Sequence, residues 1–551
     1  MAKDREPQEQ AKKEVVQGDE ALARGALAAG VRVVTGYPGS PSTGVFDNIL
    51  AHAERDETYV RWSPNEKVAM ETAIGASIGG SRTLVALKSV GLNVGLDPLA
   101  TVSLSGCHAG FVILLGDDPG AWASQNEQDS RWSLRVAEVP VVEPLSVAQA
   151  APLMHQAFTW SESLGMPVVV RVTRALTLAK GPLPSLPEPP SSQKDFLRER
   201  NRWIALPYLV ENRHRALHQN LRQIQTAFEA SPYNIQEGQG EVGVIAVGYA
   251  FSKLKELLQD QPFPCQIMGL STTWPLPERK IVAWAQSLQR ILVLEENGPF
   301  VEQQVRALAQ RHALSPHILG REEDTVPSEG ELDAAKITAA LQALLPDAQL
   351  PQQEVEERSM PSKVPLCDDC PYRPTFDALL TTMEHNGGRD RHIVIGETGC
   401  MVRANLPPME LFDIKYSLGS GLGIGLGVAL SNTDQRVVAI LGDSSFFHSD
   451  IPTMPQAVQL DLPMLVIVLD NDVTALTGGQ AHPGSSRDER GNPRAKRADL
   501  VEVIRGCGAD PLLFTPEDHV EMEEAFDRAL SADGLQVIVA RGVCPRHVEE
   551  K

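Results

Sequence analysis

Short apolar runs alternate with longer stretches of helical periodicity along most of the chain. Residues 168–172, 242–248 and 464–470 are runs rich in β-branched and other apolar residues, which is typical of strands buried on both faces. Ala- and Leu-rich segments with helical spacing separate these runs. The alternation predicts an α/β protein built from doubly wound parallel sheets with helices on both faces.

Two stretches rich in proline and polar residues interrupt this alternation. They span residues 181–195 and roughly residues 345–365, and both are typical of linkers. The sequence therefore predicts three domains, at residues 1–190, 200–350 and 360–551. A length of 551 residues agrees with three domains of about 100–200 residues each.

Charge and apolar content narrow the class of protein. The formal net charge of −21 disfavours nucleic acid or an anionic membrane as a general partner. The charged N-terminal segment has no apolar core, and no run of 18 apolar residues occurs, so we expect neither a signal peptide nor membrane insertion. Seven cysteines, an odd number, disfavour a disulfide scaffold. A cytoplasmic protein is expected.

Polar residues follow two neighbouring predicted strands in the third domain. Gly442 and Asp443 close the apolar run 437–441, and Asn471 follows the run 464–470. A helix at residues 451–460 is predicted to connect them in a βαβ unit, which places both carboxyl ends side by side. Carboxylate, amide and loop carbonyl oxygens suit Mg²⁺, and a diphosphate would complete its coordination. Two ordinary strand ends, where Asp and Asn form turns and caps, are the alternative.

A polar loop in the first domain supplies candidates for the other half of a cofactor site. Residues 36–43 follow the predicted strand 31–35 and include the hydroxyls of Ser40 and Ser42. Glu66 begins a predicted helix, with Glu71 five residues later. Gly442-Asp443, followed later by Asn471, resembles the thiamine-diphosphate signature of Gly-Asp-Gly and a later Asn, with Ser444 in the third position. A thiamine cofactor needs one carboxylate against its aminopyrimidine ring, so Glu66 is the first candidate and Glu71 the second. A solvated glutamate at a helix N-terminus is the alternative.

These motifs occur in the order found in one enzyme family and cover nearly the whole chain. Segments 36–42, 65–69, 88–93, 116–120 and 124–131 look like the pyrimidine-binding domain of the indolepyruvate:ferredoxin oxidoreductase alpha subunits, which are thiamine-diphosphate-dependent 2-oxoacid:ferredoxin oxidoreductases. Segments 442–449 and 470–484 are similar to their diphosphate-binding domain, and segment 295–304 resembles their transketolase C-terminal-like domain.

The resemblance implies a role for each polar residue. Asp443, Asn471 and the carbonyl of Val473 would bind Mg²⁺. Arg131 would hold the substrate carboxylate and His448 would assist proton transfer; a surface ion pair with Asp129 and a hydrogen-bonded loop histidine are the alternatives. The residues that would contact thiamine diphosphate are Tyr37, Ser40, Ser42, Glu66, Gly91, Gly442, Asp443, Ser444, Asn471, Thr474 and Leu476.

Four cysteines match the family's ligand pattern for one [4Fe–4S] cluster. They are Cys367, Cys370, Cys400 and Cys544, and four thiolates satisfy such a cluster. Zinc on the Cys-x₂-Cys pair, with Cys544 as a buried apolar residue, is the alternative. The other three cysteines lack such spacing and are predicted to be structural: Cys107, Cys265 and Cys507.

The resemblance also implies the reaction and the partners. An aryl-type, indolepyruvate-like 2-oxoacid would be decarboxylated oxidatively with coenzyme A to acyl-CoA, and electrons would leave through the cluster to ferredoxin or a partner subunit. A small beta subunit and a dimer of alpha subunits, or α2β2, are expected. A non-oxidative thiamine-diphosphate 2-oxoacid decarboxylase or lyase and a degenerate scaffold subunit are the alternatives.

Three features depart from the family pattern. Ser89 stands where a histidine is expected and Glu397 where an aspartate is expected, and both put the aryl substrate in doubt. The chain ends at Lys551, seven residues after Cys544. We therefore expect it to lack the C-terminal ferredoxin-like domain.

Overall fold

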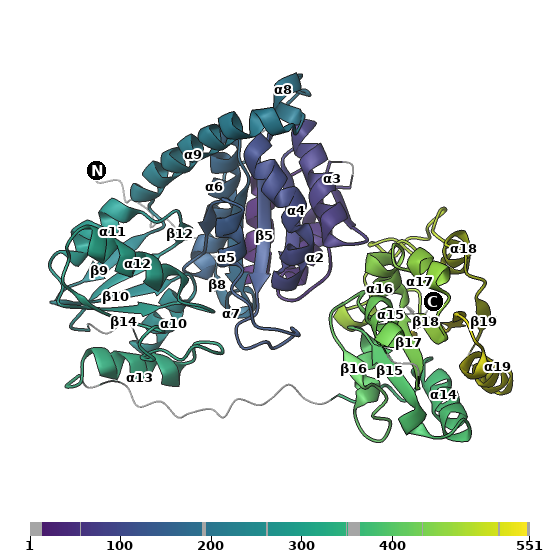
Figure 1. Cartoon of the computed structure of the whole chain (residues 1–551). Coiled ribbons are helices and arrows are strands. Elements are labelled where there is room, and N and C mark those ends of the chain that lie inside the picture. The colour runs from purple at the N-terminus through teal and green to yellow at the C-terminus, as the bar shows by residue number, and fades with distance from the viewer. Residues whose placement is uncertain are drawn as a thin grey trace, which may run out of the picture. The chain divides into compact units, whose positions relative to one another are not determined.

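The computed structural model describes residues 14–55, 57–189, 194–259, 263–348, 350, 364–431, 434–515 and 518–547. The chain forms two compact units (Figure 1). The first comprises Met1–Val60 and Ala69–Glu356, and the second comprises Arg61–Val68 and Glu357–Lys551. Both units consist of mostly parallel sheets with alternating helices, so the predicted α/β class is confirmed.

A seven-stranded sheet forms the first half of the first unit, in the order β12-β6-β7-β5-β4-β2-β3. Its parallel strands carry apolar residues on both faces, and β12 pairs with β6 in the antiparallel sense. The strands are β2 (Val33–Gly36), β3 (Tyr59–Trp62), β4 (Thr83–Lys88), β5 (Phe111–Asp117), β6 (Val141–Val142), β7 (Val168–Thr173) and β12 (Thr272–Trp274). The helices are α1 (Gly18–Ala28), α2 (Thr43–His52), α3 (Glu66–Ile78), α4 (Ser89–Ser105), α5 (Arg131–Val136), α6 (Val147–Leu164) and α7 (Arg174–Leu178).

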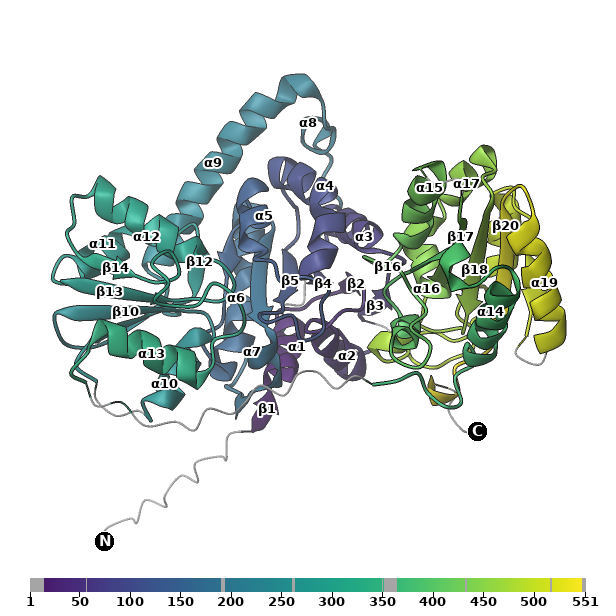
Figure 2. The same ribbon diagram turned by 60° about the horizontal axis from the view of Figure 1, so that its bottom comes forward.

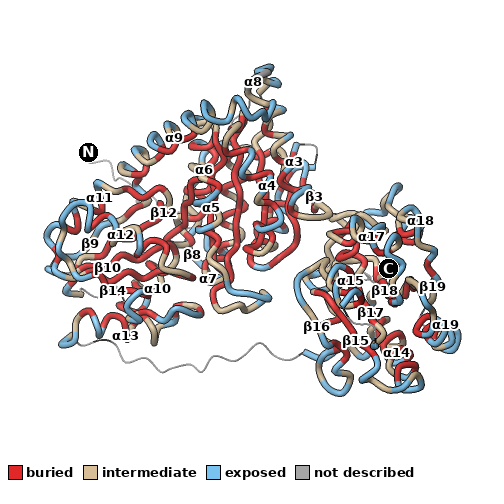
Figure 3. The backbone as a smooth tube through the Cα atoms, in the orientation of Figure 1, coloured by how far each residue is buried: buried red, intermediate tan, exposed pale blue. Residues whose placement is uncertain are grey.

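A five-stranded sheet forms the second half of this unit, in the order β14-β13-β10-β11-β9. Apolar clusters cover both of its faces, and Figure 3 shows the buried residues concentrated on the strands. The strands are β9 (Ile235–Gly238), β10 (Val242–Val247), β11 (Gln266–Leu270), β13 (Arg290–Leu294) and β14 (His317–Leu319). The helices of this half are α10 (Ala250–Leu257), α11 (Glu278–Ala285), α12 (Phe300–Arg311) and α13 (Ala334–Leu344). Before them in the chain come α8 (Arg200–Trp203) and α9 (Pro207–Glu229), and α9 contacts α4 and α6 of the seven-stranded half and α11 of this half.

The second unit is built on a six-stranded parallel sheet in the order β16-β15-β17-β18-β20-β19. One apolar cluster packs α14 and α19 on one face, and another packs α15, α17 and α18 on the opposite face (Figure 2). The strands are β15 (His392–Gly396), β16 (Ile414–Lys415), β17 (Arg436–Gly442), β18 (Met464–Asp470), β19 (Leu512–Phe514) and β20 (Gln536–Arg541). The helices are α14 (Arg373–His385), α15 (Gly421–Ser431), α17 (Met454–Leu460), α18 (Leu500–Gly506) and α19 (His519–Ser531).

Two predicted segments differ from the structure. The helix expected at residues 451–460 begins only at Met454, after a short helix α16 (Asp443–Ser445) and a π-helical turn at Phe446–Asp450. Pro455 occupies its first turn, where a missing N–H costs nothing. The first expected linker begins as strand β8 (Lys180–Pro182), which pairs with β1 (Val15–Gln17).

Residues 351–363 of the second expected linker lie outside the described residues. In the part of the chain that the structure describes, no helix combines the length and the apolarity that crossing a bilayer requires.

Arg131 lies at the start of α5 and its side chain is completely buried. The guanidinium donates to Asp129 at 2.9 and 2.7 Å and forms an ion pair with Glu295 at 2.9 Å. It also donates to the carbonyl of Glu296 at 2.9 Å. Arg131 therefore ties α5, which belongs to the seven-stranded half, to the residues that follow β13 in the five-stranded half.

Replacing Arg131 by methionine is expected to destabilise the first unit by about 3–5 kcal/mol, because the change leaves buried carboxylates unpaired. Urea unfolding of the full chain would measure this. Arg135→Met, one turn later on the same helix and exposed, is the matched control and should change stability little. An unchanged free energy of unfolding in Arg131→Met would contradict this structural role.

Candidate functional site

Asp443 lies at the carboxyl end of β17, directly beside the end of β18, because Gly442 pairs with Leu469 in the parallel register. Its Oδ2 accepts hydrogen bonds from the backbone N–H groups of Asn471 and Asp472, both at 2.9 Å. Its Oδ1 accepts from the N–H of Ser444 at 2.7 Å. The buried carboxylate of Asp443, at the end of β17, is therefore hydrogen-bonded to the backbone that follows β18. Asp443 and Asn471 lie close together, as predicted.

The loop after β18 adds polar groups to this end of the sheet. The hydroxyls of Ser444 and Thr474 lie 2.9 Å apart, and Asn471 accepts from the N–H of Val473 at 3.2 Å. His482 Nδ1 accepts from the N–H of Gly484 at 3.1 Å, so the neutral ring carries its proton on Nε2. That Nε2 lies 3.1 Å from Asp443 Oδ2.

The residues predicted to bind Mg²⁺ offer oxygen atoms, which are the ligands that this ion prefers. Asp443 offers a carboxylate, Asn471 an amide oxygen and Val473 a backbone carbonyl, and all three come from adjacent strand ends within the second unit. Hard oxygen ligands with room left for water and phosphate oxygens are typical of magnesium sites. The donor set fits the ion. Leu476, predicted to contact the cofactor, is exposed in the same loop.

Glu66 is the first residue of α3 and belongs, with residues 61–68, to the second unit. Its Oε2 lies 2.7 Å from Nε2 of His448, and the other ring nitrogen of His448 lies 2.6 Å from the hydroxyl of Ser449. Asn65 donates from its amide to the carbonyl of His448 at 2.9 Å. Both Glu66 and His448 are buried. They form a pair that can hold or pass one proton.

Four cysteines line one cavity of about 180 Å³ in the second unit. Cys367 and Cys370 precede α14, Cys400 follows β15, and Cys544 follows β20. Asn471 lines the same cavity, and the N–H of Cys544 donates to its carbonyl at 3.4 Å. Asn471 therefore belongs both to the cavity lined by the four cysteines and to the polar group around Asp443.

The cavity suits a group larger than one ion. Its volume is roughly six times that of a water molecule in the liquid. A tetrahedral zinc ion needs thiolate sulfurs about 3.8 Å apart, but among the described residues no three cysteine sulfurs all lie within 4.8 Å of one another. All four cysteines are free and only partly buried. Four thiols that line one cavity could hold a [4Fe–4S] cluster.

Burial raises the pKa of two of these thiols. It raises the pKa of Cys370 to about 11, and the neighbouring charges of Cys367, Cys400 and Cys544 raise it further. It also raises the pKa of Cys400 to about 11, against the charge of Arg403. Bound cations would be needed to keep the sulfurs of Cys370 and Cys400 as thiolates.

Comparison with known proteins decides the family. Residues 24–236 match the model of the pyruvate flavodoxin/ferredoxin oxidoreductase thiamine diphosphate-binding domain, residues 237–362 that of the indolepyruvate oxidoreductase domain, and residues 397–540 that of the C-terminal TPP binding domain of thiamine pyrophosphate enzymes. The chain is 34% identical to indolepyruvate oxidoreductase subunit IorA of Pyrococcus abyssi, with 96% of this chain and 85% of that one covered. The chain belongs to this IorA family.

A second curated relative agrees with this assignment. IorA of Archaeoglobus fulgidus is 33% identical, with 96% of this chain and 86% of that one covered. The solved 2-oxoglutarate:ferredoxin oxidoreductase from Magnetococcus marinus, with 2-oxoglutarate, coenzyme A and succinyl-CoA bound, has a TM-score of 0.49 and 15% identity over 62% of this chain and 66% of that one. The domain boundaries expected from the sequence, at residues 1–190, 200–350 and 360–551, stay a prediction.

Membership in the IorA family confirms the resemblance drawn from the motifs. The protein is thus a subunit of a thiamine-diphosphate-dependent 2-oxoacid:ferredoxin oxidoreductase, and its residues 397–540 match a thiamine-diphosphate-binding domain. The finer roles of the individual site residues remain proposals.

The remaining predicted cofactor residues of this IorA-family chain lie in the first unit. Tyr37 is buried. Ser42 donates from its hydroxyl to the carbonyl of Gly39 at 2.8 Å, so its hydroxyl closes the loop before α2. Ser40 is exposed in that loop and Gly91 is buried in the first turns of α4. Arg131 is enclosed by the carboxylates described above, and its contact with the substrate carboxylate stays a prediction.

Sequence reasoning missed a buried acidic pair behind the Asp443 strand end. Glu397 Oε1 accepts from the N–H of Gly421 at 2.6 Å, and Ser445 donates to Oε2. A Cβ on Gly421 would lie 2.7 Å from Cγ of Glu397, so only glycine allows this approach. Asp450 is completely buried beside Glu397. The substitution of Glu for the expected Asp at position 397 was the one sequence signal for this pair.

The pair makes the stability of the second unit depend on pH. Burial raises the pKa of Glu397 from 4.5 to about 7, and burial together with the charge of Glu397 raises the pKa of Asp450. The folded chain therefore keeps protons that the unfolded chain releases, and its stability falls as pH rises from about 4.5 to 7. Glu397 alone accounts for roughly 3 kcal/mol across that window.

Glu397→Gln is expected to flatten this dependence, because the amide does not titrate. The free energy of unfolding at pH 5 and pH 8 would be compared for wild type and variant. Glu384→Gln, on the exposed face of α14, is the control and should keep the wild-type slope. An equal slope in Glu397→Gln would show that the Glu397 carboxyl is ionised throughout.

Proposed function

We propose that this chain carries the thiamine-diphosphate site of an enzyme that oxidatively decarboxylates an indolepyruvate-like 2-oxoacid. The bond between the carboxyl carbon and the 2-oxo carbon breaks and CO₂ leaves. A thioester bond to coenzyme A forms, two electrons pass to two one-electron acceptors, and the proton of the thiol goes to solvent. The observation that carries the proposal is the cavity lined by Cys367, Cys370, Cys400 and Cys544, which includes Asn471 of the diphosphate motif.

The cofactor would be held by the strand ends of the second unit. Asp443, Asn471 and the carbonyl of Val473 would bind Mg²⁺, and Ser444 and Thr474 would face the diphosphate with their paired hydroxyls. When bound, thiamine diphosphate supplies the carbanion that attacks the 2-oxo carbon and accepts its electron pair. Tyr37, Ser40, Ser42 and Gly91 are proposed contacts on the first unit.

Glu66 would hold the proton that the aminopyrimidine ring must exchange. Its carboxylate is buried, and its Oε2 is hydrogen-bonded to His448. The other carboxylate oxygen of Glu66 is thereby held in position to accept a hydrogen bond from the cofactor ring. His448 in turn contacts Ser449, which orients the ring. The pair can therefore take up one proton without exposing a charge to solvent.

A [4Fe–4S] cluster held by the four cysteines would receive electrons beside this site, one at a time. The small beta subunit would complete the coenzyme A or electron-exit side, with ferredoxin or a similar carrier as the final acceptor. A dimer of these chains, or an α2β2 assembly, is the expected state. A non-oxidative lyase would need neither the cysteines nor coenzyme A.

Product analysis tests the proposal. The enzyme, purified anaerobically with its partner subunit, would be supplied with indolepyruvate, coenzyme A and an oxidised dye. We expect an acyl-CoA thioester, with two one-electron equivalents of dye reduced per CO₂. Aldehyde as the sole product, formed at the same rate without coenzyme A or dye, would support the lyase. A chain that binds no thiamine diphosphate would be a scaffold.

A further inference from the structure

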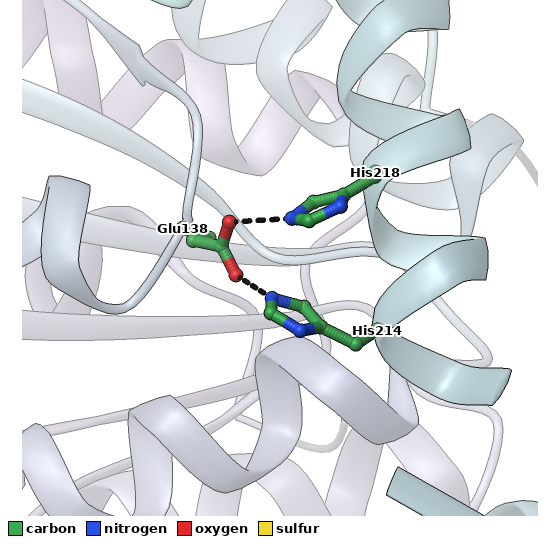
Figure 4. Close-up of side chains that lie close together, drawn as sticks. All are labelled: Glu138, His214 and His218. Atoms are coloured by element: carbon green, nitrogen blue, oxygen red, sulfur yellow. Dashed lines mark hydrogen bonds and ion pairs between the residues drawn. The ribbon is translucent and has the colours of Figure 1, made fainter. Parts of the chain in front are cut away.

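Two histidines and a glutamate of the first unit lie close together. His214 and His218 are four residues apart on α9, so both lie on the same face of that helix. Nε2 of His214 lies 2.5 Å from one carboxylate oxygen of Glu138, and Nε2 of His218 lies 2.8 Å from the other. Figure 4 shows both rings directed at this carboxylate, which comes from a separate chain segment.

The turn after α5 positions Glu138. Its φ of 57° is left-handed, an uncommon conformation for a residue with a Cβ. Its N–H donates to the carbonyl of Arg135 at 3.2 Å, and the N–H of Val139 donates to the carbonyl of Leu134 at 3.1 Å. The backbone is thus closed on both sides of Glu138, and its side chain extends to α9.

The three side chains form a donor set for a transition metal ion. Their ligand atoms all lie within 4.8 Å of one another, the one such group of three or more His, Cys, Asp or Glu side chains among the described residues. Two imidazoles and a carboxylate suit zinc and its neighbours, whereas Mg²⁺ and Ca²⁺ prefer oxygen ligands alone. A tetrahedral zinc ion holds such atoms about 3.3 Å apart, so small side-chain rotations would complete the site.

Ordinary hydrogen bonding between histidine and glutamate is the competing explanation, and the same chain provides an example. His317 lies 2.8 Å from Glu323, and both side chains are exposed. That pair has one imidazole for one carboxylate. At Glu138 two imidazoles converge on a single carboxylate, with ring centroids 4.3 Å apart. Two ring nitrogens and one carboxylate whose ligand atoms all lie within 4.8 Å of one another can share one bound cation.

The neighbouring arginines contact other groups: Arg215 pairs with Glu211 at 2.8 Å, and Arg213 donates to the carbonyl of Ile204 at 2.7 Å. Among the described residues, the two imidazoles are the side chains that contact the carboxylate of Glu138. The side chains of His214 and His218 are 45% exposed and that of Glu138 is 27% exposed. An ion can enter from solvent, and water can complete its coordination.

We propose that Glu138, His214 and His218 bind a divalent transition metal ion of the zinc class, which fastens α9 to the turn after α5. The buried residues of α9 begin only at Leu217 and continue with Leu221, Ile224 and Phe228. Residues 207–216 contribute nothing to the core. The ion holds the helix where its apolar contacts begin, and so stabilises the connection between the two sheets of the first unit.

Zinc binding by the full chain tests this site. Metal-free protein would be dialysed against buffered micromolar Zn²⁺, and bound zinc would be measured by elemental analysis in wild type and in the double variant His214→Gln/His218→Gln. Zinc held by the cysteines is common to both and cancels in the difference. We expect the double variant to bind one zinc ion fewer per chain. Zinc should also raise the unfolding temperature of the wild type more than that of the variant.

Two further variants keep the result interpretable. His317→Gln removes an exposed histidine–glutamate pair elsewhere on the first unit and should bind as much zinc as the wild type. Glu138→Gln keeps the shape of the side chain and should bind zinc more weakly, which provides a second test if the double variant does not fold. Equal zinc in the wild type and the double variant, or an equal loss in His317→Gln, would overturn the proposal.

Discussion

Replacing Glu66 by glutamine is expected to lower kcat by about 10²–10⁴-fold, the range for loss of one general acid–base group. Glutamine keeps the size of the side chain and can still hydrogen-bond to His448, which lies 2.7 Å from Glu66 in the wild type. Glutamine cannot take up the proton that the aminopyrimidine ring exchanges with Glu66. Thiamine diphosphate binding, followed by circular dichroism, should therefore change far less than the rate of CO₂ release.

Glu71→Gln is the matched control for this variant. Glu71 lies five residues later on the same helix α3 and is exposed. Its replacement should leave kcat within about twofold of the wild type, as expected of a surface change away from the site. If Glu71→Gln lost the activity and Glu66→Gln kept it, the second candidate carboxylate would take the place of the first.

Replacing Cys400 by alanine is expected to remove the iron–sulfur cluster and, with it, the oxidative reaction. Cys400 follows β15 and lines the cavity shared with Cys367, Cys370 and Cys544, so its loss leaves three ligands for a cluster that needs four. The iron content should fall from about four per chain to a small residue. Reduction of dye that depends on the 2-oxoacid should become undetectable.

Cys507→Ala is the control, because Cys507 is a free, partly buried cysteine at the end of α18 and outside that cavity. It should keep its iron and its activity. Aldehyde release by Cys400→Ala at the wild-type rate of CO₂ release would show that decarboxylation is intact and only the electron path is lost. Full dye reduction by Cys400→Ala would contradict the assignment of this cavity.

Local patterns were sufficient to predict the elements that carry the diphosphate motif. The apolar run 464–470 is strand β18, and the run 437–441 lies within β17. Glu66 is the first residue of a helix, as predicted. These features follow from side-chain periodicity and from the fixed geometry of parallel strand ends, both of which a sequence records directly.

Contacts between distant segments could not be predicted in the same way. Arg131 meets Glu295, which is 164 positions later, and both side chains are completely buried. Glu138 meets His214 and His218 across 76 and 80 positions. Two histidines four residues apart on a helix were a signal, but their acidic partner depends on how α9 packs. The π-helical turn at Phe446–Asp450 likewise follows from tertiary packing.

The most direct test of the central claim is the visible absorption of the anaerobically purified enzyme during addition of indolepyruvate. A cluster held by Cys367, Cys370, Cys400 and Cys544 beside the Asp443 site predicts brown protein with about four irons per chain. Its absorption should bleach on addition of the 2-oxoacid, only when thiamine diphosphate is present. Colourless, iron-free protein that still decarboxylates the 2-oxoacid to an aldehyde would contradict the claim.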